Sequence, residues 1–276
     1  MNIKFKSDIE RLFFINFSGY FAHTSHFPEP FLYYMSKTHK ITIENDFFYL
    51  SQFDSNFLTK TSINHFNRLN VLYTRASQIL KLIPGVMAFS LCNSLALGTY
   101  HKSSDVDLFV ILDKQTFFTS RVLIIIIFNI LRLRPKVCLS FFISDCSLSL
   151  DSIRLEKDYY LSRWLKSLCF QTSSVELIQK FNLLNTCESK YTESFRFKKF
   201  TSFFEKYLKA YQLKRATDKQ SNLPKSNGVV INDSMLKFHH NDIREAFNPH
   251  YHLQYDEFLQ GSHVKTYQQS QQAESR

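Results

Sequence analysis

The sequence predicts an α/β (α+β) fold with a small mixed β-sheet core, a winged-helix-like N-terminal region and a helical C-terminal half. Two short apolar runs bounded by turn residues, at 86–92 and 106–112, are typical of buried strands. A helix-length apolar segment, residues 116–131, separates the second run from a third at 136–143. Beyond Asp151 the apolar residues recur at helical spacing.

The N-terminal region is expected to span residues 1–60. It opens with two predicted helices, residues 9–21 and 31–37, separated by a break that contains two prolines. The string ITIENDFFYL follows, and its two β-prone runs around Asn45 predict a hairpin. Helices followed by a hairpin favour a winged-helix-like module, which binds DNA in some proteins and serves only as a packing piece in others.

The core is expected to span residues 61–150, with a first helix at 62–82 that ends before Pro84. A turn and a short helix are predicted at 94–97, between the first two strands. The helical region, 151–260, is followed by a flexible tail at 261–276, and a polar link is expected at 216–228. The helices predicted in this half are 155–170, 175–184, 193–215 and the segment SMLKFHHNDIREAF.

The charge balance favours polyanionic partners. The chain has 34 Lys and Arg against 24 Asp and Glu, a formal net charge of +10, which suits nucleotides, nucleic acid or an anionic surface without choosing among them. The five cysteines show no CxxC spacing, so neither a disulfide framework nor a zinc site is expected. A reducing cytoplasm is the predicted location.

No membrane partner is expected. The first ten residues, MNIKFKSDIE, place an acid where a secretion signal needs its apolar run. The longest apolar run, residues 122–133, includes an Asn and an Arg and is shorter than the roughly 20 residues that cross a bilayer. It is better suited to a buried core helix.

Asp105 and Asp107 are the strongest candidates for a site. Residues i and i+2 of a strand point to the same side, so these two carboxylates share a face at the head of an apolar strand. Side by side they repel each other unless a cation neutralises both. Oxygen ligands, without a neighbouring His or Cys in the sequence, favour Mg²⁺ (or Mn²⁺) over zinc.

The turn before the pair is suited to phosphate. Asn93 and Ser94 place backbone N–H groups and a hydroxyl at a predicted helix start, where anions bind well. Lys102 and Ser104 in the following loop are further candidates for phosphate contact, with a solvated turn as the alternative for this loop. Phosphate on one side and metal on the other is an arrangement typical of nucleotidyl transfer.

The string GVMAFSLCNSLALGTYHKSSDVDLFVIL resembles the signature of the nucleotidyltransferase fold superfamily, the DNA polymerase beta-like group. It is most similar to small bacterial and archaeal nucleotidyltransferase-domain proteins of unassigned substrate. The segments ILKLIPGV, KVCLSFFIS and LKFHHNDIREAF also resemble those proteins. The resemblance implies that Ser94 contacts the β- and γ-phosphates of a nucleoside triphosphate. It further implies that Asp105 and Asp107 are catalytic metal ligands, and that the acceptor is a hydroxyl of an RNA, a protein or a small molecule.

Two positions depart from the family pattern. The Gly-Ser pair of the family is Asn93-Ser94 here, and a side chain at the first position crowds the approach to phosphate. The third carboxylate, expected on the strand next to the Asp pair, is absent from KVCLSFFIS, where Ser140 takes the expected position. A third carboxylate would then have to come from Asp113 or Asp145, the nearest other acids in the sequence.

Three hypotheses follow for function. The leading one is a Mg²⁺-dependent nucleotidyltransferase. The second is a catalytically degenerate module of the same fold that binds nucleotide or nucleic acid without turnover, suggested by the missing third acid. The third is a nucleic-acid-binding protein acting through the N-terminal module and a basic helix.

Two further patterns have alternative interpretations. Four histidines, His239, His240, His250 and His252, match no usual metal spacing. In residues 196–215 aromatic residues recur at helical spacing with Lys and Arg between them. The simpler interpretation is an amphipathic helix that packs its aromatic face, and the alternative is a helix that also follows a phosphate backbone.

Overall fold

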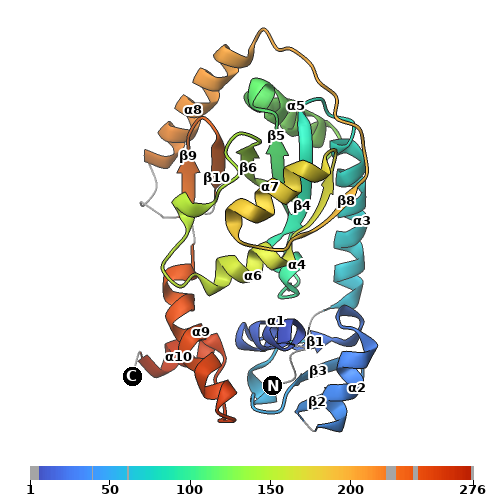
Figure 1. Cartoon of the computed structure of the whole chain (residues 1–276), viewed down its shortest axis with the longest axis vertical. Helices are drawn as coiled ribbons and strands as arrows, with labels where there is room; N and C mark the ends of the chain where they lie inside the picture. Colours follow the sequence, from blue (N-terminus) through green and yellow to red (C-terminus); the bar gives the residue numbers. More distant parts are fainter. Residues whose placement is uncertain (1–5, 39, 61, 222–227, 239–241, 275–276) are drawn as a thin grey trace.

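The computed structural model describes residues 6–38, 40–60, 62–221, 228–238 and 242–274 (Figure 1). It confirms the predicted α/β class, with helices packed around a mixed sheet and a second, smaller sheet in the N-terminal region. No helix within these ranges combines the length and the apolar character needed to cross a membrane.

The N-terminal region contains the predicted hairpin. Strands β2 (Ile41–Glu44) and β3 (Phe47–Leu50) pair antiparallel around Asn45, whose φ of 56° suits an Asn in a tight turn. With β1 (Ala22–His23) they form a three-stranded sheet of order β1-β3-β2. Helices α1 (Lys6–Phe17) and α2 (Glu29–Lys37) lie where helices were predicted. The assignment of this arrangement as a winged helix stays a prediction.

The main sheet has the order β8-β7-β4-β5-β6-β10-β9. Its centre is the predicted strand, turn, strand, helix, strand unit, in which β5 and β6 pair in parallel and β4 pairs antiparallel to β5. The seven strands are β4 (Val86–Cys92), β5 (Val106–Leu112), β6 (Val137–Ser144), β7 (Cys169–Thr172), β8 (Lys190–Glu193), β9 (Val229–Ile231) and β10 (Met235–Phe238).

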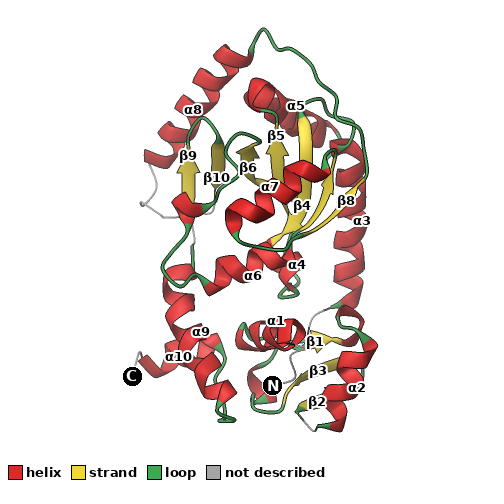
Figure 2. Ribbon diagram, in the orientation of Figure 1, coloured by secondary structure: helices red, strands yellow, loops and turns green. Residues whose placement is uncertain are grey.

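Helices cover both faces of this sheet (Figure 2). Every residue of β5 is buried, because Leu108 and Val110 pack with one set of helices while Phe109 and Ile111 pack with the other. Asp107 has the parity of Phe109 and therefore belongs to the face covered by α6. The first set is α3 (Ile63–Leu80), α5 (Phe117–Ile130) and α8 (Glu205–Ser221), and the second is α6 (Tyr159–Ser167) and α7 (Val175–Asn185).

The two ends of the chain build a second core together. The ring of Phe13 on α1 lies 5.3 Å from that of Tyr251 on α9 (Arg244–Leu259), and α10 (Tyr267–Glu274) packs beside α9. Figure 1 shows these helices adjacent at the end of the molecule below α4 and α6. The segment predicted as a tail thus contains α10. The predicted domain boundaries at residues 60, 150 and 260 stay predictions.

The C-terminal half is helical as predicted, but it also supplies four strands that the sequence did not indicate. The predicted helix 155–170 ends at Ser167 and is followed by β7. SMLKFHHNDIREAF is divided between β10 and the start of α9. These strands have three or four residues each, too few for a visible period, and they form because the edges of β4 and β6 offer hydrogen-bond partners.

Candidate functional site

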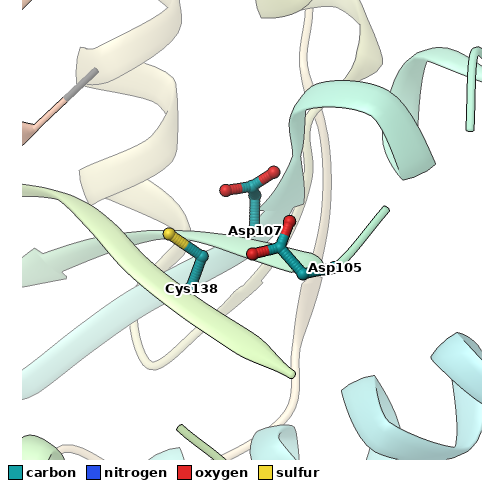
Figure 3. A group of neighbouring side chains, drawn as sticks. All are labelled: Asp105, Asp107 and Cys138. Atoms are coloured by element: carbon teal, nitrogen blue, oxygen red, sulfur yellow. The ribbon is translucent and has the colours of Figure 1, made fainter. Parts of the chain in front are cut away.

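Asp105 and Asp107 lie together at the beginning of β5 (Figure 3). One carboxylate oxygen from each, together with the sulfur of Cys138, falls in a group whose atoms all lie within 4.8 Å of one another. Asp107 is buried, with 8% of its surface exposed, whereas Asp105 is only partly buried. Two carboxylates this close favour a bound cation, because otherwise their charges repel or one carboxylate takes up a proton.

Cys138 occupies the place expected for the third carboxylate. In the parallel ladder between β5 and β6 it is the partner of Asp107. The register thus pairs Asp107 with Cys138 rather than with Ser140, the residue chosen from the sequence. The register shifts between Asp107 and Phe109, so that Phe109 pairs with Phe141 and Ser140 falls at the irregularity. The side chain of Ser140 lies outside the described part of the chain.

Asp113 and Asp145 do not complete the cluster. Both follow the far ends of their parallel strands, about 20 Å from Asp107 at the usual rise per strand residue. Each carboxylate has local hydrogen bonds instead: Asp113 accepts one from the backbone N–H of Gln115, at 3.0 Å, and Asp145 one from that of Lys114, at 2.9 Å. These are turn interactions at the opposite end of the sheet.

Asn93 begins the short helix α4 (Asn93–Leu97) in a left-handed conformation, with φ of 55°. Glycine and asparagine tolerate this region best, which explains how Asn replaces the glycine of the resembling family. Its Oδ1 accepts a hydrogen bond of 2.9 Å from the indole Nε1 of Trp164 on α6. The side chain is thus held toward α6.

The other predicted phosphate contacts divide into two groups. Ser94 and Ser104 come together, with their hydroxyl oxygens 3.4 Å apart, and the backbone N–H of His101 donates to the Ser104 hydroxyl at 3.0 Å. Lys102 is exposed in the turn between them. Ser103 is also exposed, and its hydroxyl lies 2.8 Å from Nδ1 of His101, which fits the solvated-turn interpretation for this part of the loop.

A cavity of about 280 Å³ adjoins the cluster. Asn93, Ser94 and Asp107 line one part, and a second wall comes from α6, from β10 and from Asp242, Ile243 and Arg244. This volume is near the lower end of small-molecule sites. The remaining lining residues are Phe141, Ile153, Tyr160, Leu161, Trp164, Lys237, Asp242, Ile243 and Arg244.

A buried ionic cluster forms that second wall. Arg244 donates to Asp158 at 2.7 Å and to Asp242 at 2.6 Å, and Nζ of Lys237 lies 3.6 Å from Asp242. Burial opposes the ionisation of Asp242, but Arg244 and Lys237 outweigh it and lower the pKa of Asp242. Burial lowers the pKa of Lys237 to about 8, although Asp242 acts in the opposite direction. The positive charges of Lys237 and Arg244 therefore balance the negative charges of Asp158 and Asp242.

Tyr160 and Cys92 are neutral neighbours of the Asp pair. Burial raises the pKa of Tyr160, and the charge of Asp107 raises it further. Burial also raises the pKa of Cys92, the antiparallel partner of Asp107 on β4, and Asp107 is again the second cause. Both groups keep their protons at neutral pH and add no negative charge beside the pair.

Sequence reasoning missed Cys138, Tyr160, Trp164 and the ionic cluster around Arg244. The one available signal was the segment LKFHHNDIREAF, which contributes Lys237, Asp242 and Arg244 to the cavity wall. His239 and His240 of that segment lie outside the described residues. Within the described ranges, the grouping of His, Cys and acidic side chains close enough to share a metal is Asp105, Asp107 and Cys138, which includes neither His250 nor His252.

The donor set fits a divalent cation held by oxygen. Asp105 and Asp107 present the hard ligands that Mg²⁺ and Mn²⁺ prefer. Cys138 is a soft ligand, which Mg²⁺ does not select. A cation bound to the two carboxylates would therefore complete its shell with oxygens from water or a bound phosphate.

Comparison with known proteins agrees with this geometry. Residues 93–160 match the family model of the nucleotidyltransferase domain, a segment that begins at Asn93 and includes the Asp pair, β5, α5 and β6. The match is consistent with a member of the nucleotidyltransferase-fold superfamily. No curated protein and no solved structure matches the chain significantly.

Proposed function

We propose that this chain, whose residues 93–160 match the family model of the nucleotidyltransferase domain, moves a nucleoside monophosphate from a nucleoside triphosphate to a hydroxyl group in a reaction that requires Mg²⁺ or Mn²⁺. The observation that supports this most directly is the grouping of Asp105, Asp107 and Cys138, because Asp107 also lines a cavity together with Ser94. The acceptor is the hydroxyl of an RNA, a protein or a small molecule.

The roles of the residues follow from their places. Asp105 and Asp107 hold the cation, which when bound neutralises the two carboxylates and polarises the phosphate undergoing transfer. In this proposal the Ser94 hydroxyl and the backbone N–H groups beside it donate hydrogen bonds to phosphate oxygens. Asn93 fixes the conformation of that turn through its bond to Trp164.

The ionic cluster has a supporting role in this proposal. Arg244 and Asp158 are almost fully buried, and their pairing ties the start of α9 to the start of α6. Lys237 and Tyr160 close the cavity wall and exclude water from the reacting phosphate. Because the charges of this wall already balance one another, its contribution is to position α6 and α9 and to keep water out of the cavity.

The single tryptophan offers a direct binding test. Trp164 is the only Trp of the chain and lines the cavity, so its fluorescence reports on occupancy. We expect each nucleoside triphosphate that binds to change this fluorescence in the presence of Mg²⁺. The same titration with Asp105→Ala/Asp107→Ala should show a loss of the Mg²⁺-dependent part, and Asp113→Ala, at the far end of β5, is the matched control.

Transfer is tested separately. The protein is incubated with each α-labelled nucleoside triphosphate and cell extract, and label in macromolecules and small products is measured. We expect label transfer that needs a divalent cation and disappears in the Asp105→Ala/Asp107→Ala protein. Absence of any label transfer that depends on these two residues contradicts the proposed enzyme.

A second candidate function is favoured by one observation. The place of the third carboxylate is taken by Cys138, which cannot act as a carboxylate base, and general-base assistance is worth roughly 10² to 10⁴ in rate. A module that binds nucleotide without turnover would show the fluorescence change without label transfer. The two experiments together therefore separate the two functions.

A further inference from the structure

Four aromatic side chains are exposed at the beginning of α8. Phe203, Phe204, Tyr207 and Tyr211 have 94%, 69%, 70% and 51% of their surface accessible. The interpretation of residues 196–215 as a helix that packs its aromatic face is therefore wrong for this part of the segment. Phe203 and Phe204 lie in the turn just before α8 (Glu205–Ser221), and Tyr207 and Tyr211 lie in its first two turns. Exposed aromatic residues gathered in this way are typical of a binding surface rather than of a folded core.

The exposure follows from how α8 is attached. Glu205 accepts hydrogen bonds from the backbone N–H groups of Phe118 and Thr119, at 2.8 and 2.9 Å, at the start of α5. Gln212 donates to the carbonyl of Phe118 at 2.9 Å. Leu208 lies between these two anchors and packs on the core beneath the helix. The spacing of Glu205, Leu208 and Gln212 fixes which side of α8 faces the body.

The exposed aromatic residues lie along the neighbouring side. Each of Phe204, Tyr207 and Tyr211 comes directly before one of the three anchoring residues. The three rings therefore have the same helical spacing as the anchors and share one face. The anchors hold that face outward. We define the aromatic–basic face as Phe203, Phe204, Tyr207 and Tyr211 with Lys206, Lys214 and Arg215.

Positive charge surrounds these rings. Residues 196–221 contain eight Lys and Arg against two acids, Glu205 and Asp218, which gives this segment over half of the formal net charge of +10. The carboxylate of Glu205 is already engaged by the start of α5. Lys206, Lys214 and Arg215 are exposed, and Nη1 of Arg215 lies 3.4 Å from the hydroxyl of Tyr211. Rings and cations thus alternate on one surface.

We infer that the aromatic–basic face binds single-stranded nucleic acid, with unpaired bases stacked on the rings and phosphates paired with Lys206, Lys214 and Arg215. Stacking on aromatic side chains beside a positively charged track is how proteins bind single strands without sequence preference. A bilayer fits less well, because a helix that lies on a membrane needs an apolar stripe along its length. Here the same face continues as Lys214 and Asp218.

This surface also bears on the acceptor. Figure 1 shows the start of α8 at the opposite end of the main sheet from α4, the helix that includes Ser94. The separation is at least the length of β5, about 23 Å for seven strand residues. A small acceptor does not bridge that distance, whereas a nucleic acid does. The inference that the acceptor is a nucleic acid rests on the proposed function, while the binding itself does not.

Binding is tested with the full chain and labelled oligouridylate or oligothymidylate of about 16 nucleotides, by fluorescence anisotropy across a salt series. We expect Phe203→Ala/Phe204→Ala/Tyr207→Ala to weaken binding at least about tenfold, because each lost stacking contact weakens it by about fivefold or more and up to three are lost. We expect Lys206→Gln/Lys214→Gln/Arg215→Gln to weaken binding and to make its logarithmic salt dependence shallower by about 2.

The controls are matched in exposure. Tyr33→Ala removes an aromatic side chain that is 66% exposed on α2, and Lys180→Gln removes an exposed charge on α7; both should bind as the unchanged protein does. Asp105→Ala/Asp107→Ala should also retain full affinity, so failure of the proposed reaction leaves this result unaffected. Equal loss in the control and test variants overturns the inference. So does binding to anionic phosphatidylserine vesicles that depends on these residues when the oligonucleotides do not bind.

Discussion

Cys138 is the direct neighbour of Asp107 in the ladder between β5 and β6, and its sulfur lies within 4.8 Å of a carboxylate oxygen from each of Asp105 and Asp107. A thiol thus stands where a third acid would complete an oxygen-only metal site. The backbone pairing of this position with Asp107 comes from the ladder between β5 and β6. The position is therefore suited to a change of ligand.

Replacing Cys138 by Asp should strengthen the response to divalent cations. Without a cation, three carboxylates repel one another, so we expect the metal-free Cys138→Asp protein to melt at a lower temperature than the unchanged one. Mg²⁺ should raise its melting temperature by more, because binding to the folded state stabilises it in proportion to affinity. Thermal melting with and without Mg²⁺ measures both effects.

The matched control is Cys146→Asp, which places an acid at an exposed cysteine in the loop after β6. If both variants respond to Mg²⁺ alike, the cation is not held at the cluster. In the transfer assay, a rate increase in Cys138→Asp of the order of 10² or more would show that a missing base limits the reaction.

The protein with Asn93 should be more stable than variants with Gly or Ala at this position. Asn93→Gly keeps the left-handed backbone but leaves the indole N–H of Trp164 without its acceptor, at a cost of about 1–3 kcal/mol. Asn93→Ala loses the same bond and adds backbone strain of about 1–2 kcal/mol. Urea unfolding should therefore order the proteins Asn93, Gly, Ala from most to least stable. An alanine variant as stable as the glycine variant would contradict the role of φ.

Because of Lys237, we expect the free energy of unfolding to rise at alkaline pH. Its pKa is about 8 in the folded chain, because burial disfavours the charged form, against 10.5 in the unfolded chain. Between these values the unfolded chain binds a proton that the folded chain does not, so the free energy of unfolding rises with pH. The rise amounts to about 3 kcal/mol at most and is complete near pH 10.5.

Lys237→Met should abolish this contribution. Tyrosines and cysteines also titrate above about pH 8, but they are common to both proteins, so the difference between the two unfolding curves isolates Lys237. Urea unfolding from about pH 7 to about pH 10.5 measures it. Lys180→Met, at an exposed position of α7, should parallel the unchanged protein. A constant difference between the Lys237→Met and unchanged proteins across this range would refute the prediction.

Replacing Arg244 should lower the stability of the fold. Its partner Asp158 has a fully buried side chain and also caps α6 by accepting a hydrogen bond from the N–H of Leu161 at 2.9 Å. Arg244→Met leaves this carboxylate without its cation and is expected to destabilise the fold by about 3–5 kcal/mol. Asp158→Asn/Arg244→Met should recover part of the loss, because the uncompensated charge is gone. Chemical unfolding of the single and double variants measures the coupling.

The central unit of the fold was predictable because its signals are local. Strands β4, β5 and β6 and helices α3 and α5 fall within a few residues of the predicted ranges, since each is long enough to show its own period. The short strands β7 to β10 depend on neighbours far along the chain. Nothing within CFQT or MLKF distinguishes a strand from the end of a helix.

The candidate site likewise has features that follow from local sequence and features that depend on contacts between distant segments. That Asp105 and Asp107 share a face follows from two residues of strand geometry, which the sequence determines by itself. That Cys138 pairs with Asp107 depends on the parallel register of β5 and β6 across the intervening α5, and an irregularity of the ladder shifts that register beyond this pair. Lys237 and Arg244 reach the cavity only because β10 pairs with β6. Local periodicity is encoded residue by residue, whereas contacts between distant segments are selected by the burial of the whole chain, and only the tertiary structure decides them.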